Sequence, residues 1–562
     1  MTRTEAIPFR RGIASLICAL GLTLFGAGCE TAGGGLATDG TGRIVNAPAG
    51  AVQGDAERGV TVYRGIPYAK APVGELRWAP PEAYPDWEAT RDATTFGPAC
   101  PQPLPRGRNI YAVSYDAIDE DCLSLNVWVP DEAKDAPVFV WIHGGSLTGG
   151  AGSLAMYEGA ALARETGMVV VTINYRLGVL GYLAHPGLSA ASAQGISGNY
   201  GLMDQITALE WVERNIAAFG GDPENVTLAG ESAGALSVML MMVSPQARGL
   251  FDKAIAQSAY MVSMAHLNVA ENGHPSEEAK GAALVEKMGL TSLEEMRAAP
   301  AGDLVDQSVA AGYFPFPNID GLYLTEQMAE TFDKGEQAPV PVLAGYNEGE
   351  IRSLRFLLPP KPDTSDAYET AIRAAYGPLA DTFLGHYPSD DMMESMLATT
   401  RDAMYGWTAH KLADRQARIG QASYLYFFDH GYPAADALGL HAFHASEIPY
   451  AFGTINIDPP WPQIPNELAE RRLSAAMMDY WSSFARTGSP VADKHPDWPT
   501  YASTLGGIAF TDAPYAVSGL MRDRFELHDE VVCRRLHDGG LQWNWNVGII
   551  SPPLPPEVPE CS

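Results

Sequence analysis

A five-residue motif, Gly230-Glu-Ser-Ala-Gly234, places the strongest constraint on what this chain can fold into. The motif follows an apolar run at residues 226–229, which has the length of a buried strand. It precedes a longer apolar run at residues 235–243, which is typical of a helix. A sharp strand-to-helix turn exposes the central serine hydroxyl above the sheet, and flanking glycines let neighbouring backbone approach where a Cβ would clash. The pattern therefore predicts a nucleophile elbow with Ser232 at its tip.

Further apolar runs indicate that the elbow belongs to a large sheet. Four more segments have the composition of buried parallel strands: residues 138–142, 168–173, 340–344 and 424–428. Between strands lie amphipathic helical patterns, such as residues 204–217, which place Leu209, Val212 and Ile216 on one face. Strands that alternate with helices predict an α/β fold with a large, mostly parallel central sheet and helices on both faces.

The chain has 562 residues, and no low-complexity linker divides its body. Residues 42–537 are therefore expected to form a single domain. Within it, the polar and helix-rich residues 271–337 are expected to cover the sheet rather than extend it. The Gly- and Pro-rich residues 538–562 predict an extended or loosely packed C-terminal tail.

The charge of the chain argues against one class of partner. The formal net charge is −30, from 67 acidic and 37 basic side chains. Such a field repels phosphate backbones, so nucleic acid is not expected as a partner. His143 follows a predicted strand, but no ligand cluster with metal-binding spacing accompanies it. The sequence therefore predicts no metal and no organic cofactor.

The N-terminus predicts export. Basic residues precede an apolar run at residues 12–25, which is too short for a membrane span and has the length of a signal-peptide core. Small residues then precede Cys29 and resemble a lipoprotein box, although Gly26 stands where such boxes usually carry Leu. We expect a signal peptide at residues 1–28, lipidation of Cys29, a flexible tether at residues 29–41, and a periplasmic or outer-membrane-tethered protein. An ordinary secretory signal, followed by secretion, is the alternative.

Six cysteines occur in the sequence, and export permits disulfides. Cys18 would leave with the signal peptide. Cys100 and Cys122 enclose a short loop and are the preferred pair, and Cys533 and Cys561 are a second possible pair. Spacing alone does not determine the connectivity.

A serine nucleophile requires a base and a group of hydrogen-bond donors for its oxyanion. In this architecture the donors come from a loop after an earlier strand. The strand at residues 138–142 continues into His143, Gly144, Gly145 and Ser146, and the two glycines allow backbone N–H groups to face inward. This loop is the predicted donor loop.

With these motifs in place, the chain resembles the type-B carboxylesterase family, which also contains the cholinesterases. The resemblance spans nearly the whole body and rests on several ordered motifs: Arg64-Gly-Ile-Pro-Tyr-Ala69, Glu120-Asp-Cys-Leu-Ser-Leu-Asn126, Asn174-Tyr-Arg-Leu-Gly178, Gly198-Asn-Tyr-Gly-Leu202 and Phe219-Gly-Gly-Asp-Pro-Glu-Asn225. It implies an α/β-hydrolase fold and a Ser-Glu-His triad. It also implies a disulfide between Cys100 and Cys122.

Position by position, the resemblance places the oxyanion donors on the backbone N–H groups of Gly145, Ser146 and Ala233. The family usually has three glycines followed by an aromatic residue, whereas Ser146 and Leu147 occupy the last two places here. The N–H of Ser146 can therefore donate only if its φ angle tolerates a Cβ.

The resemblance also selects the acid and the base. The family pattern Gly-x-Asn-x-Asp-Glu, aligned without a gap, places the catalytic acid on Glu350. Glu348 precedes a glycine as the family acid does, but it requires a two-residue gap. The catalytic histidine of the family precedes a Glu-Ile pair by three residues, which selects His444 over His441. Glu231 and Glu447 are candidates for tuning the site.

These residues predict a serine hydrolase that cleaves a small-molecule carboxylic ester through an acyl-enzyme intermediate. Two rival enzymes share the fold: an amidase, and a specialised hydrolase of a natural polyester or toxin. A non-catalytic binding or adhesion protein is the alternative of another class, because some relatives keep the fold without the nucleophile. Ser232, Glu350 and His444 together favour the enzyme.

Overall fold

The computed structural model describes residues 42–104, 110–544 and 546–561. These residues belong to a compact unit that extends from Gly40 to Ser562. The predicted signal peptide, the lipidation site Cys29 and the tether at residues 29–41 lie outside the described residues. Among the described helices, none combines the length and the apolar character needed to cross a membrane.

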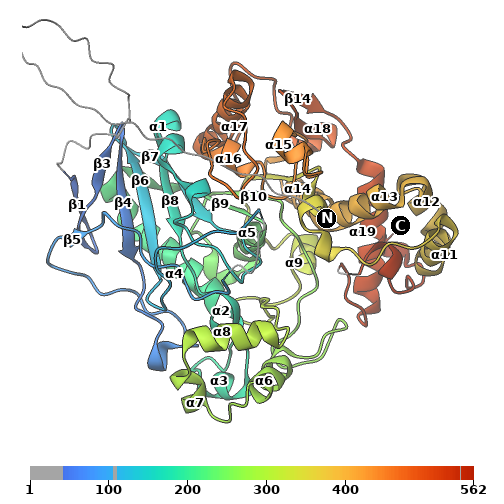
Figure 1. The fold of residues 1–562 in the computed structure, drawn as a ribbon, viewed down its shortest axis with the longest axis horizontal. Coiled ribbons are helices and arrows are strands. Elements are labelled where there is room, and N and C mark those ends of the chain that lie inside the picture. Colours follow the sequence, from blue (N-terminus) through green and yellow to red (C-terminus); the bar gives the residue numbers. More distant parts are fainter. Residues whose placement is uncertain (1–41, 105–109, 545, 562) are drawn as a thin grey trace, which may run out of the picture. The chain divides into compact units, whose positions relative to one another are not determined.

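The main sheet of the described chain has 11 strands (Figure 1). Their spatial order is β14-β13-β12-β11-β10-β9-β7-β8-β6-β4-β3. In chain order the strands are β3 (Asp55–Glu57), β4 (Val60–Pro67), β6 (Ser124–Pro130), β7 (Ala136–Ile142), β8 (Val169–Ile173), β9 (Gly221–Glu231), β10 (Lys253–Gln257), β11 (Val342–Asn347), β12 (Ser423–Phe428), β13 (Gly507–Phe510) and β14 (Pro514–Val517). A small separate sheet contains β1 (Ile44–Ala47), β2 (Gly50–Gln53) and β5 (Arg91–Asp92).

The centre of the main sheet is parallel. Strands β8, β7, β9, β10, β11, β12 and β13 all pair in parallel, and antiparallel strands occur only toward the two edges of the described sheet. The five apolar runs of the sequence correspond to β7, β8, β9, β11 and β12. Because the carboxyl ends of parallel strands meet at one edge, the loops after β7, β9, β11 and β12 lie on the same side of the sheet.

Both faces of the sheet are buried, and β7 explains why. Its alternate residues Val138, Val140 and Ile142 belong to one hydrophobic core, whereas Phe139 and Trp141 belong to the core on the opposite face. A strand with two buried faces has a continuous apolar run rather than an alternating one. The predicted architecture, a mostly parallel sheet with helices on both faces, is confirmed.

The helices are divided between the two faces. Residues of α4, α5 and α14 pack in the first core, and residues of α1, α16 and α17 pack in the second (Figure 1). The helices are α1 (Ala160–Thr166), α2 (Gly178–Tyr182), α3 (Pro186–Ala191), α4 (Tyr200–Asn215), α5 (Ala233–Val243), α6 (Glu277–Lys287), α7 (Leu293–Ala298), α8 (Ala301–Ala310), α9 (Met328–Lys334), α10 (Glu350–Ser353), α11 (Ser365–Tyr376), α12 (Ala380–His386), α13 (Met392–Arg401), α14 (Trp407–Arg418), α15 (Pro433–Asp436), α16 (Ile448–Phe452), α17 (Leu468–Thr487), α18 (Tyr501–Thr504) and α19 (Arg522–Asp538).

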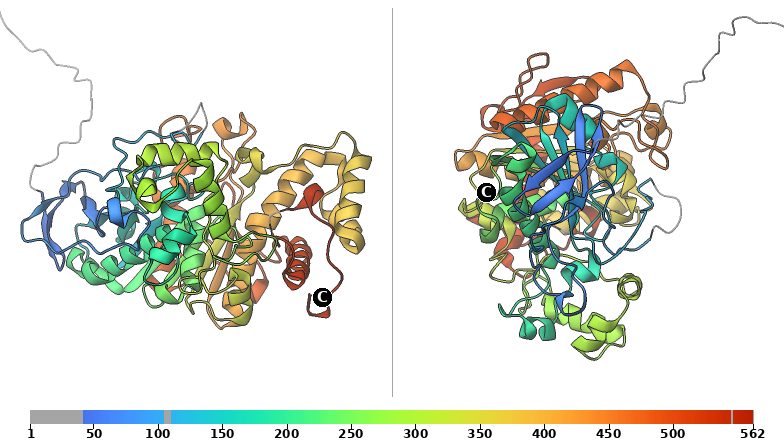
Figure 2. Two further views of the ribbon diagram at one scale, coloured as in Figure 1. Left: turned by 90° about the horizontal axis from the view of Figure 1, so that it is seen from below. Right: turned by 90° about the vertical axis from the view of Figure 1, so that its left-hand side faces the viewer.

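Two groups of helices lie outside the sheet layers. Helices α6, α7 and α8 do not extend the sheet, but instead of covering it, as expected for residues 271–337, they form a separate small core with residues of α2 and α3. Within that range, α9 packs against the first core of the sheet. On another part of the unit, α11 and α12 share a core with α19, beside which the C-terminal residues run (Figure 2). A π-helix at Asp402–Gly406 joins α13 to α14 without a break in the chain's helical path.

Part of the C-terminal segment is packed more closely than the extended or loosely packed tail that its composition predicts. Trp543 is fully buried, and its ring centroid lies 6.2 Å from that of Trp407. The side-chain amide of Asn544 donates to the carbonyl of Met261 at 2.7 Å. The buried indole thus packs against α14, and the buried amide ties this short segment to the loop after β10.

Two disulfides are present in the described chain. Cys100 pairs with Cys122, as the resemblance implies, with a Cα–Cα distance of 5.1 Å. Cys533 in α19 pairs with Cys561 near the C-terminus, with a Cα–Cα distance of 5.6 Å. The second bond ties the C-terminal segment to α19.

Candidate active site

The turn between β9 and α5 is built as the glycine motif predicts. Ser232 has φ 57° and ψ −122°, a conformation that costs a non-glycine residue about 1–3 kcal/mol. A Cβ on Gly234 would lie 2.0 Å from the carbonyl oxygen of Ile142, and a Cβ on Gly230 would lie 2.5 Å from the backbone of Gly234. The N–H of Ser232 donates to the carbonyl of Gln257 in β10 at 2.9 Å, which holds the turn in place.

The donor loop leaves β7 next to this turn. Gly145 has φ 108° and Ser146 has φ 55°, so both lie in the left-handed region that glycine tolerates best. The N–H groups of Thr148 and Gly149 donate to the carbonyl of Gly145 at 3.0 and 3.1 Å, which fixes the bend. Gly145 and Ser146 are exposed. The Cβ of Ser146 is therefore accommodated by a strained backbone that faces open space.

The donor loop and the elbow are in direct contact. A Cβ on Gly144 would lie 2.8 Å from Oε2 of Glu231 and 3.1 Å from Cβ of Ser232. Glycine at position 144 thus lets the loop lie against the serine. Ala233 is the first residue of α5, so its N–H has no acceptor within the helix. The start of the donor loop and the first residue of α5 therefore both lie beside Ser232.

The predicted acid and base form a close pair. Nδ1 of His444 lies 2.5 Å from Oε2 of Glu350. Glu350 is fully buried in the first turn of α10, directly after β11, and its Oε1 accepts the N–H of Asn347 at 2.8 Å. His444 is also buried. Oε2 of the glutamate thus fixes the tautomer of the imidazole, with the proton on Nδ1.

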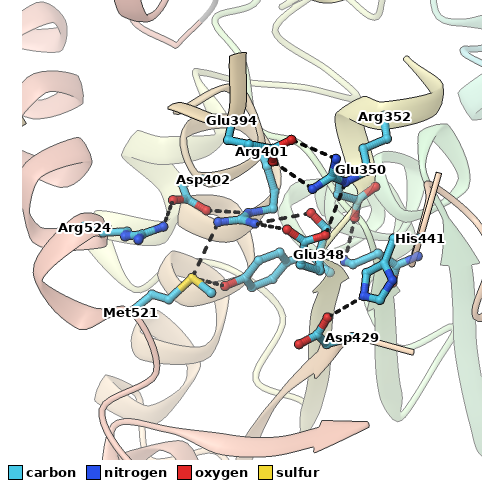
Figure 3. A network of polar contacts seen from close by, with 12 residues as sticks. Glu348, Glu350, Arg352, Glu394, Arg401, Asp402, Asp429, His441, Met521 and Arg524 are labelled. Atoms are coloured by element: carbon cyan, nitrogen blue, oxygen red, sulfur yellow. Dashed lines mark hydrogen bonds and ion pairs between the residues drawn. The ribbon is translucent and has the colours of Figure 1, made fainter. Parts of the chain in front are cut away.

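The two competing residues of the sequence analysis lie elsewhere. Glu348 pairs with Arg352 at 3.5 Å and with Arg401 at 3.2 Å (Figure 3). His441 lies between two other carboxylates and does not contact Glu350. The contacts therefore favour Glu350 and His444 over Glu348 and His441.

The other nitrogen of His444 faces the residue before the nucleophile. Nε2 lies 3.1 Å from Oε1 of Glu231, which is the distance of an ion pair but without the alignment of a hydrogen bond. Burial raises the pKa of Glu231 well above its usual range. Burial alone lowers the pKa of His444, but the carboxylates of Glu231 and Glu350 outweigh burial and raise that pKa. Each nitrogen of the imidazole thus faces one buried carboxylate, Nδ1 that of Glu350 and Nε2 that of Glu231.

A third buried carboxylate completes the polar centre. Oε1 of Glu447 accepts the side-chain amide of Gln257 at 3.0 Å, and Oε2 accepts that of Asn347 at 2.6 Å. Burial, together with the charge of Glu350, raises the pKa of Glu447. Through Glu447, these amides connect the end of β11 to the end of β10 beside the elbow.

Two tyrosines that no sequence motif indicates lie next to the base. The hydroxyl of Tyr111 donates to the carbonyl of His444 at 2.8 Å, and its oxygen also lies 2.8 Å from Oγ of Ser353. Tyr405 lies in the π-helix, with its ring centroid 5.3 Å from that of His444. Neither residue belongs to a recognisable motif, because each reaches the site from a distant segment of the chain.

The chain is similar to known proteins over most of its length. A model of the carboxylesterase family matches residues 41–517. The para-nitrobenzyl esterase of Bacillus subtilis (strain 168) is 35% identical over 472 residues, covering 82% of this chain and 93% of the relative. The fumonisin B1 esterase of Sphingopyxis macrogoltabida is 35% identical over 489 residues, covering 83% and 85%. A solved PNB esterase structure aligns with a TM-score of 0.75 at 31% identity, covering 87% of this chain and 99% of that one.

The similarities extend over the main sheet, the elbow and the loops that carry the acid and the base. They confirm the family resemblance and the α/β-hydrolase fold that the motifs indicate. They also support the hydrolysis of carboxylic esters as the reaction. This chain belongs to the carboxylesterase family.

Proposed function

We propose that this carboxylic ester hydrolase works through an acyl-enzyme on Ser232, with His444 as general base and Glu350 as the partner of that base. The observation that carries the assignment is the 2.5 Å contact between His444 and the buried Glu350, at the sheet edge where the elbow ends β9. A buried carboxylate on Nδ1 leaves Nε2 as the proton acceptor. The strained turn places Ser232 directly after Glu231, whose Oε1 lies 3.1 Å from that nitrogen.

The reaction follows from these roles. Nε2 of His444 takes the proton of Ser232 as Oγ attacks the ester carbonyl. The oxyanion of the tetrahedral intermediate accepts hydrogen bonds from the N–H groups of Gly145, Ser146 and Ala233. When the intermediate collapses, the alkoxide leaves with the proton from His444. Water then attacks the acyl-enzyme by the same route, which releases the acid and restores Ser232.

The similar esterases guide the choice of test substrates. By their names, one relative acts on para-nitrobenzyl esters and another on fumonisin B1. We therefore propose a small-molecule ester as the substrate, with a toxin ester as the second candidate. A matched set of one ester and one anilide with the same acyl group separates an esterase from an amidase.

Replacement of the nucleophile gives the first test. We expect Ser232→Ala to lower kcat on a short p-nitrophenyl ester by about 10⁶-fold, because the reaction then loses its covalent route. Steady-state kinetics measure the change, and a fluorophosphonate probe should label the wild-type protein and not the variant. Ser503→Ala, at an exposed position in α18, is the control and should retain both activity and labelling.

Two results would contradict this assignment. Near-normal turnover by Ser232→Ala would place the nucleophile elsewhere. A wild-type protein that neither turns over esters nor reacts with the probe would favour the binding or adhesion protein.

The two glutamates give a second test. We expect Glu350→Gln to lower kcat by about 10⁴-fold, because an amide cannot hold the Nδ1–H tautomer or stabilise the imidazolium. Glu348→Gln should stay within about threefold of the wild type, because its carboxylate contacts arginines rather than His444. Both variants are compared by kcat at one pH. A larger loss in Glu348→Gln would reassign the acid.

The carboxylate of Glu231 predicts a pH effect. His444 must be neutral to accept a proton, and a negative charge beside Nε2 favours its protonated form. We expect Glu231→Gln to lower the pKa of His444, so that the acidic limb of kcat/KM moves by about one unit to lower pH. Glu213→Gln, at an exposed position in α4, should leave the limb in place. A shift to higher pH in Glu231→Gln would contradict the proposed electrostatics.

We propose further that the protein is exported and tethered to a membrane through Cys29, with residues 1–28 removed and residues 29–41 as a spacer. The small residues before Cys29 support lipidation. Two disulfides in the body support an oxidising compartment.

A bacterial host provides the test of the tether. We expect globomycin to leave the precursor unprocessed, and Cys29→Ser to abolish both processing and incorporation of labelled palmitate. Cys18→Ser, within the signal-peptide core, is the matched control and should be processed normally. Processing that ignores globomycin would indicate an ordinary secretory signal instead.

A further inference from the structure

A second histidine lies at the start of the loop that carries His444. Nε2 of His441 lies 3.0 Å from Oδ1 of Asp429, at the end of β12 (Figure 3). Nδ1 lies 3.0 Å from Oδ1 of Asp436 in α15. An imidazole donates from both nitrogens only when it is protonated. The ring that satisfies both carboxylates is therefore the imidazolium, which bridges two elements of the fold.

The surrounding backbone leaves room for this bridge. A Cβ on Gly431 would lie 2.2 Å from Nδ1 of His441 and 2.6 Å from Oδ1 of Asp436. His441 itself has φ 50°, a left-handed conformation that is uncommon for a residue other than glycine. The ring thus occupies a space that a glycine keeps open, at the cost of local backbone strain.

The segment that His441 anchors is paired with the loop of the acid. The N–H of Gly349 donates to the carbonyl of Ala442 at 2.7 Å, and the side-chain amide of Asn347 donates to that of Phe443 at 2.9 Å. A Cβ on Gly349 would lie 2.5 Å from the carbonyl oxygen of Leu440. These contacts flank His441 on both sides and end one residue before His444. A displacement of His441 would therefore move the base relative to Glu350.

Charged groups face His441 from three elements. Asp429 follows β12, Asp436 lies in α15, and Glu348 follows β11; the polar atoms of Glu348, Asp429 and His441 all lie within 4.8 Å of one another. Arg352 and Arg401 face Glu348 from α10 and α13 (Figure 3). The hydrogen bond to Asp429 is the largest influence and, with Asp436, raises the pKa of His441 to about 9, against the opposing effect of burial.

We propose that His441 is a positioning residue for His444: its imidazolium links Asp429 to Asp436 and thereby fixes the loop that sets the base against Glu350. The inference rests on the proposed role of His444. Because the pKa of His441 is raised, the bridge is complete at neutral pH and is lost as the pH rises through about 9. Above that pH one ring nitrogen can no longer donate, and the loop is held by a single carboxylate.

The test compares His441→Gln with a matched control. His495→Gln makes the same substitution in another His–Asp pair, where Nε2 lies 3.3 Å from Oδ2 of Asp479 in α17. Rates on p-nitrophenyl acetate are measured from pH 7 to 9.5 and divided by the active sites that a fluorophosphonate probe titrates. We expect His441→Gln to lower kcat about tenfold at pH 7.5 with KM within twofold, because a small displacement of a base slows the chemistry more than binding. His495→Gln should match the wild type.

The pH dependence separates positioning from a loss of stability. The ratio of wild-type kcat to that of His441→Gln should shrink above pH 9, where the wild-type protein also loses its bridge. His441→Arg keeps a positive charge at every pH and should recover most of the rate at pH 7.5. Asp436→Asn, at an exposed position, keeps the ring but removes one carboxylate, so its alkaline decline should begin at lower pH.

Two outcomes would overturn the inference: a corrected kcat of His441→Gln equal to that of the wild type at pH 7.5, or a ratio that is the same at pH 7.5 and 9.5. If His441→Gln does not fold, an alkaline decline of Asp436→Asn identical to that of the wild type overturns the inference as well. A wild-type protein that the probe does not label would instead refute the proposed function, which is a distinct result.

Discussion

The close approach of β7 to the turn after β9 is the contact on which the site depends. The carbonyl of Ile142 lies where a Cβ of Gly234 would be, so β7 and α5 share a space that only glycine allows. The same approach brings the donor loop against Ser232, because Gly144 also lacks a Cβ. The strained φ of Ser232 is maintained because the hydrogen bond to Gln257 and the packing of α5 leave the turn no alternative. Nucleophile and donors are thus positioned by one backbone contact.

The base is positioned in a different way, by buried charge. Glu231, Glu350 and Glu447 are all buried within the same centre, and such carboxylates need partners because isolated charges are costly away from water. His444 is the partner of Glu231 and Glu350. The side-chain amides of Gln257 and Asn347 donate hydrogen bonds to Glu447. The partners come from β10, β11 and the loop before α16, so satisfying these carboxylates holds three segments together. The polar centre is therefore part of the structure as well as part of the chemistry.

Sequence patterns predicted the parts of the molecule that follow local rules. The strands around β7 and β9, the elbow and the pairing of Cys100 with Cys122 have periodic or motif signals. The burial of Trp543 and the contact of Tyr405 with His444 have none, because both depend on tertiary packing against distant segments. Tyr405 reaches the base from a π-helix, whose extra residue per turn changes which side chains face inward without altering composition. Ser146 departs from the family pattern, and only its observed φ shows how the loop accommodates it.

Two histidines three residues apart meet opposite electrostatic demands. His444 is buried and must gain and lose a proton during each catalytic cycle. The neighbouring buried carboxylates raise its pKa and so oppose the loss of that proton. His441 lies toward solvent, where exposed carboxylates favour a permanent proton. The hydrogen bond from the N–H of Gly349 to the carbonyl of Ala442 lies between the two histidines. His441 and His444 therefore belong to one loop but bind different carboxylates. His441 has a left-handed φ of 50° in the segment between α15 and α16, which carries both histidines.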